Sequence, residues 1–441
     1  MKPTKRPPIS RARRMLALIL LMLVPLAPAG AQTATAPAPL PAVTTPYVLV
    51  DARTGEVIEE RDAARPWYPA STTKLMTLYV ALAAVRAGEI GLQSPVVMSA
   101  RAAAEPPSKM GFKKGTVITL DNALKMLMVK SANDVAVAVA EAVGGSVEAF
   151  SNRMNAQARR LGMVATHLVN PHGLPDPRHV SSARDMALLG RALIADFPEY
   201  RAYLNLHAIQ IGKTVLKNYN TLVERYPGTT GMKTGYICSS GFNLVASAQR
   251  NGREMIAVVF GSYNALERAE QAAVLLEKGF RSRALFGGAR PQLASLRSGA
   301  EFSEPLDMCP YLKARRGAIA TGDSEQPEFK TLPNGMVVIQ QGDQVRPTHL
   351  GQKIAYGPPI RVYVGGASGP SPAGGLAVAD APLPKARPNP PAALASASPM
   401  SAFVGQANAA GAPFPASEGP LTLLPSAPAK SAAPLPRAKP N

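Results

Sequence analysis

Apolar positions along the chain repeat with two different periods, and their order predicts a mixed fold. Spacings of three and four residues, typical of a helix with one buried face, occur at 120–129, 135–143, 147–161, 184–194 and 266–278, and 75–85 reads as an apolar helix. Strand-like runs form two hairpin patterns, 47–51 with 56–60 and 243–248 with 255–260. This order predicts an α/β (α+β) fold: an antiparallel sheet carrying N- and C-terminal helices, with a helical cluster inserted in the middle.

The last third of the chain has weaker patterns. Short strand patterns at 336–339 and 359–364 predict a small β-rich module within 286–369. Residues 370–441 hold 16 of the 43 prolines, together with many Ala, Ser and Gly residues. Because such a composition buries too little apolar surface to offset chain entropy, we expect this tail to be disordered.

The first 31 residues have the three parts of a secretory signal peptide. Six Lys and Arg residues precede an apolar stretch at 15–27, and the small-residue site Ala29-Gly30-Ala31 follows it. The apolar stretch is shorter than the ~20 residues that span a membrane, so cleavage near Ala31 is favoured over an uncleaved anchor. We therefore expect an exported protein, in the periplasm or associated with the cell wall, with an Ala/Pro/Thr-rich linker at 32–46.

Charge and histidine spacing narrow the possible partners. The formal net charge is +19, of which residues 1–31 contribute +6. This excess suits a polyanionic surface such as a cell wall or anionic lipid. Nucleic acid is disfavoured, because the chain is expected to be exported and has no basic run interleaved with aromatic residues. The five histidines lack metal-ligand spacing, so no metal and no other cofactor is expected.

The candidate chemistry begins at Ser71-Thr72-Thr73-Lys74, at the start of the 75–85 helix. Residues i and i+3 share a helix face, so the hydroxyl and the amine can meet. A serine needs a base to become a nucleophile, and a lysine whose pKa is lowered by burial can be that base. The alternative is a simple helix cap by Ser71, although a cation in the first turn opposes the helix dipole.

Two further motifs follow in order, Ser131-Ala132-Asn133 and Lys233-Thr234-Gly235. Taken singly, the first reads as a cap for the helix at 134–143 and the second as a turn before a strand. The ordered set of Ser-x-x-Lys, Ser-x-Asn and Lys-Thr-Gly is typical of penicillin-recognising serine enzymes. With the flanking stretches 68–77, 170–174 and 241–246, residues 45–285 resemble the serine-type D-alanyl-D-alanine carboxypeptidases (peptidase family S11), the low-molecular-mass penicillin-binding proteins.

The resemblance implies a DD-peptidase fold for 47–285 and a peptidoglycan stem peptide ending in D-Ala-D-Ala as substrate. Ser71 would attack the penultimate carbonyl, Lys74 would act as base and Ser131 would relay a proton to the leaving amine. The substrate-binding side chains would be Asn133, Lys233 and Thr234. The backbone N–H groups of Ser71 and Tyr236 would form the oxyanion hole. β-Lactam antibiotics would inhibit by acylating Ser71.

Three other readings compete with this one. A class A β-lactamase would need a glutamate between the second and third motifs, but no Glu occurs between Glu148 and Glu199. A Ser-His-Asp triad of Ser71 with His172 or His179 and Asp185 is compatible with the spacing. A cell-wall binding protein that has lost activity is disfavoured, since all three motifs are intact.

Some features are open or differ from the family. Cys238 and Cys309 can pair in an oxidising compartment; we favour a disulfide over two buried thiols, although sequence does not give their separation. Arg268 is expected to form a structural ion pair. Thr229-Thr230 stand where many relatives have an acidic residue. The family's C-terminal amphipathic helix is missing, so membrane contact is left open.

Overall fold

The computed structural model of the protein describes residues 43–282, 290–297, 303–320, 328–341 and 344–365. The expected signal peptide, most of the linker and the Pro-rich tail lie outside these described residues. All described residues belong to one compact unit. Within them, no helix has the length and apolar character needed to cross a membrane.

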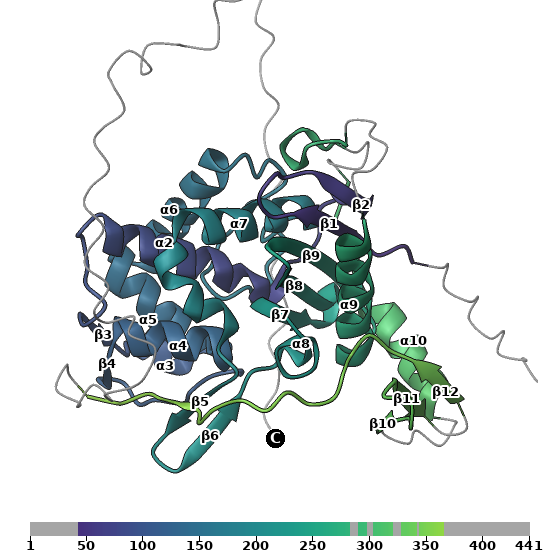
Figure 1. Cartoon of the computed structure of the whole chain (residues 1–441). Helices are drawn as coiled ribbons and strands as arrows, with labels where there is room; N and C mark the ends of the chain where they lie inside the picture. Colours follow the sequence, from purple (N-terminus) through teal and green to yellow (C-terminus); the bar gives the residue numbers. More distant parts are fainter. Residues whose placement is uncertain (1–42, 283–289, 298–302, 321–327, 342–343, 366–441) are drawn as a thin grey trace, which may run out of the picture. The chain divides into compact units, whose positions relative to one another are not determined.

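An antiparallel sheet of five strands forms the centre of the fold, in the order β2-β1-β9-β8-β7 (Figure 1). The strands are β1 (Tyr47–Asp51), β2 (Val57–Arg61), β7 (Thr229–Ile237), β8 (Gly241–Arg250) and β9 (Arg253–Ser262). The four strands expected from the apolar pattern are confirmed, and β8 and β9 are longer than expected. β7 is an addition, because the pattern at 229–237 predicts no strand. It forms one edge of the sheet.

Alternation along the strands divides the core into two layers. Val48 and Val50 of β1 join the cluster formed with the helical side of the molecule, whereas Leu49 between them joins the opposite cluster. The opposite face is covered by helix α9 (Ala265–Arg281) (Figure 1). α9 packs closely because Gly279 has no side chain there: a Cβ would lie 3.0 Å from Met255 Cγ.

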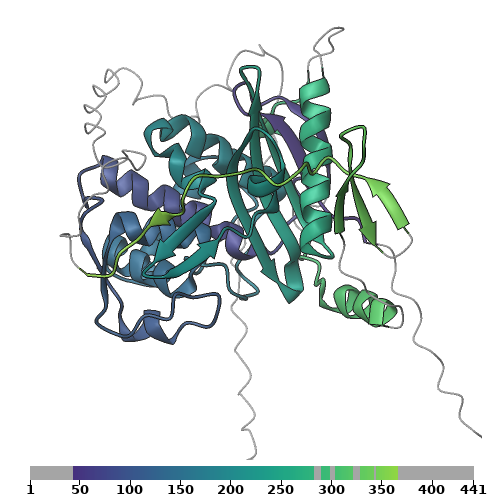
Figure 2. The same cartoon turned by 60° about the horizontal axis from the view of Figure 1, so that its bottom comes forward.

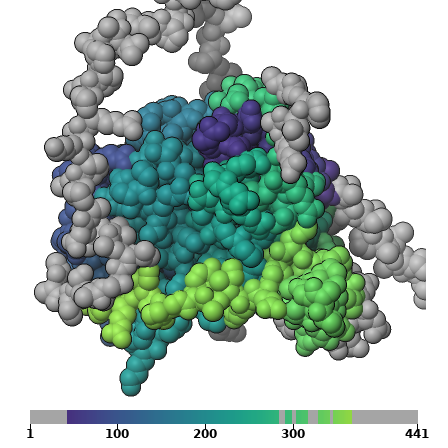
Figure 3. All heavy atoms as spheres, viewed as in Figure 1, coloured from purple at the N-terminus to yellow at the C-terminus, as the bar shows by residue number. Residues whose placement is uncertain are grey.

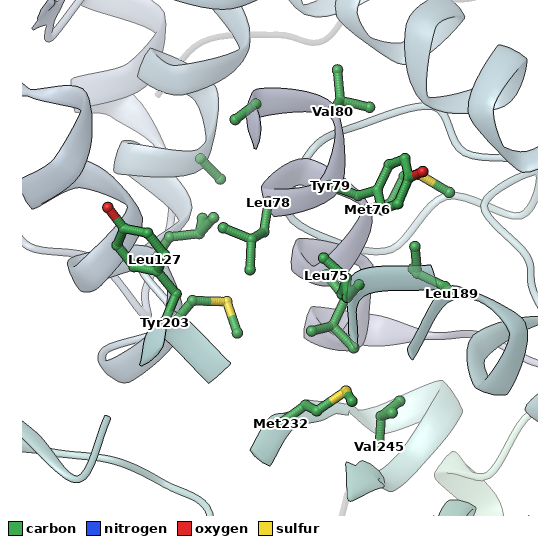
Figure 4. Packing of buried hydrophobic residues seen from close by; sticks show 14 of the residues in the cluster. Leu75, Met76, Leu78, Tyr79, Val80, Leu127, Leu189, Tyr203, Met232 and Val245 are labelled. Atoms are coloured by element: carbon green, nitrogen blue, oxygen red, sulfur yellow. The ribbon is translucent and has the colours of Figure 1, made fainter. Parts of the chain in front are cut away.

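Helix α2 (Lys74–Arg86) lies between the sheet and the helical cluster. Its residues from 74 to 82 are all buried, as expected for a helix that is apolar on every side. In Figure 4, Leu75 and Leu78 of α2 lie among side chains from the cluster and from the sheet edge. The helical layer comprises α3 (Ala100–Ala104), α4 (Leu120–Val129), α5 (Asn133–Gly144), α6 (Val147–Arg160) and α7 (Ala183–Asp196).

The predicted helices are confirmed, with small shifts at their ends. The helix expected at 120–129 has these bounds as α4, because its apolar residues recur at spacings of three and four and Thr119 caps it through the Asn122 N–H. The alternative reading of the second motif as a helix cap is wrong: neither Ser131 nor Asn133 caps α5, and its N-cap residue is Ala132, which has no side-chain acceptor.

Several short elements have no sequence prediction, since three to eight residues contain too few repeats of any period. They include β3 (Pro95–Val97), β4 (Val117–Thr119), β5 (Ala208–Ile211), β6 (Thr214–Lys217), α8 (Thr221–Arg225) and the 3₁₀ helices η1 (Ala70–Thr73), η2 (Pro198–Asn205), η3 (Cys238–Ser240) and η4 (Leu293–Ser295).

The C-terminal part contains the expected strands and an unexpected helix. β10 (Glu328–Thr331), β11 (Val337–Gln341) and β12 (Gln344–Pro347) form a small antiparallel sheet, and helix α10 (Cys309–Ala320) precedes it. The chain then crosses the surface of the main fold to β13 (Ile360–Arg361), which pairs in parallel with β5 (Figures 2 and 3). The extent of a separate module at 286–369 stays a prediction.

A disulfide joins Cys238, directly after β7, to Cys309 at the start of α10. Their Cα atoms are 4.9 Å apart, within the usual range for a disulfide. Next to it, the Met308 N–H donates to the Ser239 carbonyl at 3.0 Å. The favoured pairing of the two cysteines is therefore present, and it attaches α10 to the turn between β7 and β8.

We predict that replacing both cysteines (Cys238→Ser with Cys309→Ser) lowers the free energy of unfolding by about 2–4 kcal/mol, because the unfolded chain regains the entropy of a long closed loop. Urea unfolding of the two proteins measures the difference. The reductant dithiothreitol should destabilise the native protein by a similar amount and leave the double variant unchanged. Equal midpoints with and without reductant in the native protein would contradict this role.

Candidate active site

Ser71 lies in the 3₁₀ turn η1, which continues directly into α2. Neither element has a side-chain cap, so the reading of Ser71 as a helix cap is wrong. Ala70 before it has a φ of 49°, in the left-handed region that alanine rarely adopts. Backbone strain of this kind is frequent at functional sites.

Three segments of the chain meet at the Lys74 amine. Nζ lies 3.0 Å from Ser71 Oγ, 2.8 Å from Asn133 Oδ1 and 2.8 Å from the His172 carbonyl oxygen. The amide and carbonyl oxygens are acceptors only, so they take two N–H groups. A neutral amine has two N–H groups and one lone pair, which leaves the lone pair for the Ser71 hydroxyl. Three oxygens also suit the three N–H groups of a charged lysine, so the lowered pKa of Lys74, and not these contacts, selects the neutral form that can accept the serine proton.

The electrostatic environment favours the same state. Lys74 is completely buried, and burial together with the nearby Lys233 lowers its pKa well below the ordinary lysine value. The carboxylates of Asp134 and Glu105 act in the opposite direction and raise that pKa. Burial is the largest of these effects.

The α4–α5 connection supplies Ser131 and the first residue of α5 is Asn133; both are buried. Ser131 has a φ of 59°, a second left-handed non-glycine residue at the site. The Asn133 amide is oriented on both sides: Nδ2 donates to the Pro106 carbonyl at 2.9 Å and Oδ1 accepts from Lys74. Among the described residues, Ser131 Oγ forms no hydrogen bond with Ser71 or Lys74.

A tight turn at 170–174 brings the His172 carbonyl to Lys74. Asn170 Oδ1 accepts from the N–H groups of His172 and Gly173, at 3.3 and 2.7 Å. Gly173 has a φ of 84°, and a Cβ there would lie 1.8 Å from the Ala70 carbonyl oxygen. Only glycine fits between this turn and the residue that precedes Ser71.

Strand β7 carries the third motif along the opposite side of the site. Lys233 is 2 % exposed and donates from Nζ to the Thr234 carbonyl at 3.0 Å. Burial and the neighbouring Arg268 lower the pKa of Lys233 to about 7. Gly235 touches the segment that carries Ser71, since a Cβ on it would lie 3.0 Å from the Ser71 backbone nitrogen. Tyr236, the next residue, has an exposed side chain that packs on Phe242.

Asn243 on β8 ties the chain before Ser71 to the sheet. Its Nδ2 donates to the carbonyls of Tyr68 and Pro69, at 2.9 and 3.2 Å, while its Oδ1 accepts from Gly261 N–H at 3.0 Å. The Trp67 indole N–H donates to the Ser240 carbonyl at 2.9 Å. These contacts set the position of η1 relative to β7.

The expected ion pair of Arg268 is wrong. Within the described part of the chain this side chain meets no carboxylate; it lies over the Phe242 ring and donates to the carbonyls of Asn243 and Tyr219, at 3.3 and 3.4 Å. Its Nε is buried without a partner. The guanidinium is thus a second buried cation beside Lys233, and burial lowers its pKa to about 10.

The Ser-His-Asp reading is also wrong. The His179 ring lies between Thr73 Oγ1 and the Val169 N–H, at 2.8 and 3.1 Å. The carboxylate of Asp185 accepts from Thr166 Oγ1 and pairs with the Arg184 guanidinium. The His172 ring lies against Glu105 and Leu174. None of these rings bonds to Ser71, so lysine is the base within reach.

The structure therefore brings Ser71, Lys74 and Asn133 into direct contact, with Lys233 and Gly235 alongside. It adds groups that the motifs do not indicate: Asp134, Asn243, Glu105 and the His172 carbonyl. Asp134 is a helix-opening acid directly after Asn133, which is a usable signal; a backbone carbonyl leaves none. The described residues include no cluster of three or more His, Cys, Asp or Glu side chains suited to a metal ion.

Comparison with known proteins shows which family the chain belongs to. The family model described as D-alanyl-D-alanine carboxypeptidase (peptidase S11) matches residues 31–264, more than half of the chain. The chain is 36% identical over 239 residues to the D-alanyl-D-alanine carboxypeptidase DacF of Bacillus subtilis (strain 168), covering 53% of this chain and 61% of that protein. The chain belongs to the peptidase S11 family.

Solved structures give the same fold. Penicillin binding protein 5 from Haemophilus influenzae has a TM-score of 0.51 and 34% sequence identity, covering 55% of this chain and 72% of that one. Penicillin-Binding Protein D2 from Listeria monocytogenes, in its cefotaxime-bound form, has a TM-score of 0.50 and 26% identity, covering 55% of this chain and 100% of that one. The expected DD-peptidase fold is confirmed.

We predict that Lys233 sets the basic limb of the pH dependence of acylation. Lys233 is charged below its pKa of about 7, so its attraction for a ligand carboxylate is present below that pH and is lost as pH rises through it. The basic limb of the rate constant for acylation by benzylpenicillin should therefore fall near pH 7. In Lys233→Arg the guanidinium keeps its charge, and the limb should move to higher pH.

Stopped-flow or gel measurement of this rate constant from pH 5 to 10 gives the pH at which the basic limb falls in each protein. The matched control is Lys217→Arg on the exposed strand β6, which should leave it in place. An unchanged limb in Lys233→Arg would show that another group controls it.

Proposed function

We propose that the protein is a serine-type D-alanyl-D-alanine carboxypeptidase that removes the terminal D-alanine from peptidoglycan stem pentapeptides through an acyl-enzyme. The carrying observation is the buried Lys74 amine, which lies 3.0 Å from Ser71 Oγ and is held in place by the Asn133 and His172 oxygens. The chain spans 61% of the length of the DacF relative, so we propose this activity for the chain and do not take it directly from that relative.

Acylation begins with Ser71 and Lys74. The Ser71 oxygen attacks the carbonyl of the penultimate D-alanine as its proton passes to Lys74 Nζ. The tetrahedral intermediate then collapses, the amide C–N bond breaks and the terminal D-alanine leaves after its amine gains a proton. Ser131 is the proposed relay for this proton, because it precedes Asn133 on the connection that holds Lys74. Water later hydrolyses the ester and restores the Ser71 hydroxyl.

Substrate binding is assigned to the edge strand β7. An extended peptide can add to an exposed sheet edge, which places its backbone beside the strand. The terminal carboxylate would meet Lys233 and the Thr234 hydroxyl, with Arg268 adding positive charge behind them. Asn133 would hold the substrate amide. The N–H groups of Ser71 and Tyr236 would bind the oxyanion, each donor contributing about 3 kcal/mol in comparable sites.

β-Lactam antibiotics are proposed to acylate Ser71 and inhibit the enzyme. The similar Listeria protein has been solved in a cefotaxime-bound form, which supports this expectation. The absence of any Glu between Glu148 and Glu199 favours a long-lived acyl-enzyme over rapid β-lactam hydrolysis. We further propose export to the periplasm or cell wall by a cleaved signal peptide, with the catalytic domain at 47–285.

The function predicts D-alanine release that depends on Ser71. Incubation of the purified protein with a D-Ala-D-Ala-terminated pentapeptide should release free D-alanine, and Ser71→Ala should reduce the rate by ~10³-fold or more, since no nucleophile remains. Fluorescent penicillin should label the native protein and should not label Ser71→Ala.

The control is Ser282→Ala, directly after the end of α9, where the hydroxyl donates to the Gly279 carbonyl; this variant should retain activity and labelling. No D-alanine release by the folded native protein, or labelling that survives Ser71→Ala, would refute the proposed function.

A further inference from the structure

The inference concerns Glu105, a carboxylate that no motif indicates. It follows helix α3 and belongs to the same loop as Pro106 and Ser108, whose carbonyls accept from the Asn133 side chain and backbone, at 2.9 and 2.8 Å. The side chain is 16% exposed and its Oε2 lies 3.4 Å from His172 Nε2. Glu105 thus connects the Asn133 loop with the turn that presents the His172 carbonyl to Lys74.

The His172 ring is held in one tautomer. Its Nδ1 accepts from the Leu174 N–H at 3.1 Å, so the ring proton is assigned to Nε2, which faces Glu105. Burial lowers the pKa of His172, so the ring is neutral at pH 7. The contact is therefore a hydrogen bond to a carboxylate, and it holds the pKa of Glu105 below its usual value. Glu105 remains charged.

The Glu105 carboxylate adds negative charge to the surroundings of the Lys74 amine. Lys74 is faced by Lys233 from β7, Asp134 from α5, Glu105 from the loop after α3, and the neutral rings of His172 and His179 from the 167–180 segment. Asp134 already accepts from the Met110 and Gly111 N–H groups, at 3.0 and 2.8 Å, and is completely buried. Of these two carboxylates, Glu105 is the one that also contacts the ring of His172, the residue whose carbonyl oxygen accepts from Lys74 Nζ.

We propose that Glu105 is a positioning residue of the acylation reaction, which holds the His172 turn beneath Lys74 and supplies negative charge near the Lys74 amine. It touches neither the substrate nor the reacting atoms; it acts through Lys74. This proposal rests on the proposed function for the role of Lys74 as base. It goes beyond the three motifs, because it assigns a role to a residue outside all of them.

Two variants separate the two parts of the role. Glu105→Gln retains an acceptor for His172 Nε2–H and removes only the charge. Glu105→Ala removes both. A matched control is Glu148→Gln, since Glu148 lines the same cavity of about 610 Å³ but pairs with Arg101 at 2.8 Å and has a 69% exposed side chain.

The experiment measures the rate constant for acylation by fluorescent penicillin as a function of pH. Without the Glu105 charge, Lys74 loses its proton more readily, so the acid limb of Glu105→Gln should shift to lower pH with little loss at the plateau. Glu105→Ala should show this shift and about a tenfold lower plateau, as expected for losing one positioning hydrogen bond. Glu148→Gln should overlay the native profile.

Each outcome decides the proposal. A Glu105→Gln profile that overlays the native one, or an acid limb that moves to higher pH, overturns it. A uniform loss of rate at every pH would show that Glu105 is only structural, and also overturns it. Penicillin acylation without D-alanine release would instead count against the proposed substrate and still test Glu105. If Glu105→Ala does not fold, Glu105→Gln and Glu105→Asp, which keeps the charge and the native limb, suffice.

Discussion

The buried amine of Lys74 is the constraint on which the site depends. An ammonium group without water is expensive, and a lysine this deep is tolerated when it is neutral and fully hydrogen-bonded. Its partners come from η1, from the first residue of α5 and from the 170–174 turn, so three separate segments must meet at one atom. The packing of α2 between sheet and helices places Nζ at that meeting point.

A second buried lysine, Lys233, gives the site two amines whose preferred charge states differ. Lys74 and Lys233 face each other in a region of low dielectric, so holding two charges there is unfavourable. Sites with acid and base functions commonly separate the pKa values of neighbouring groups by their surroundings. Here burial and the nearby charge of Lys233 favour a neutral Lys74, whereas an incoming carboxylate would stabilise the charged form of Lys233. Lys74 can thus act as a base while Lys233 binds a carboxylate, although both are buried.

Sequence reasoning identifies the long elements and the motif side chains. The helix at 120–129 is predictable to the residue because its apolar period is sustained and Thr119 caps it. Strand β7 is not, because Gly231 and Gly235 interrupt the apolar alternation that marks a strand. Ser71, Lys74 and Asn133 are predictable from ordered spacing. The His172 carbonyl is not, since a backbone oxygen has no sequence signature and its position depends on tertiary packing.

The close approach of β7 to η1 explains why glycine is needed in the third motif. A side chain at Gly235 would meet the Pro69 carbonyl oxygen at 2.9 Å and the Ser71 nitrogen at 3.0 Å. The contacts of Asn243 to Tyr68 and Pro69 hold that segment against the sheet, so it cannot move away without breaking buried hydrogen bonds. The edge strand that would bind substrate and the turn that carries the nucleophile are therefore positioned by one another, and a larger residue at 235 would separate them.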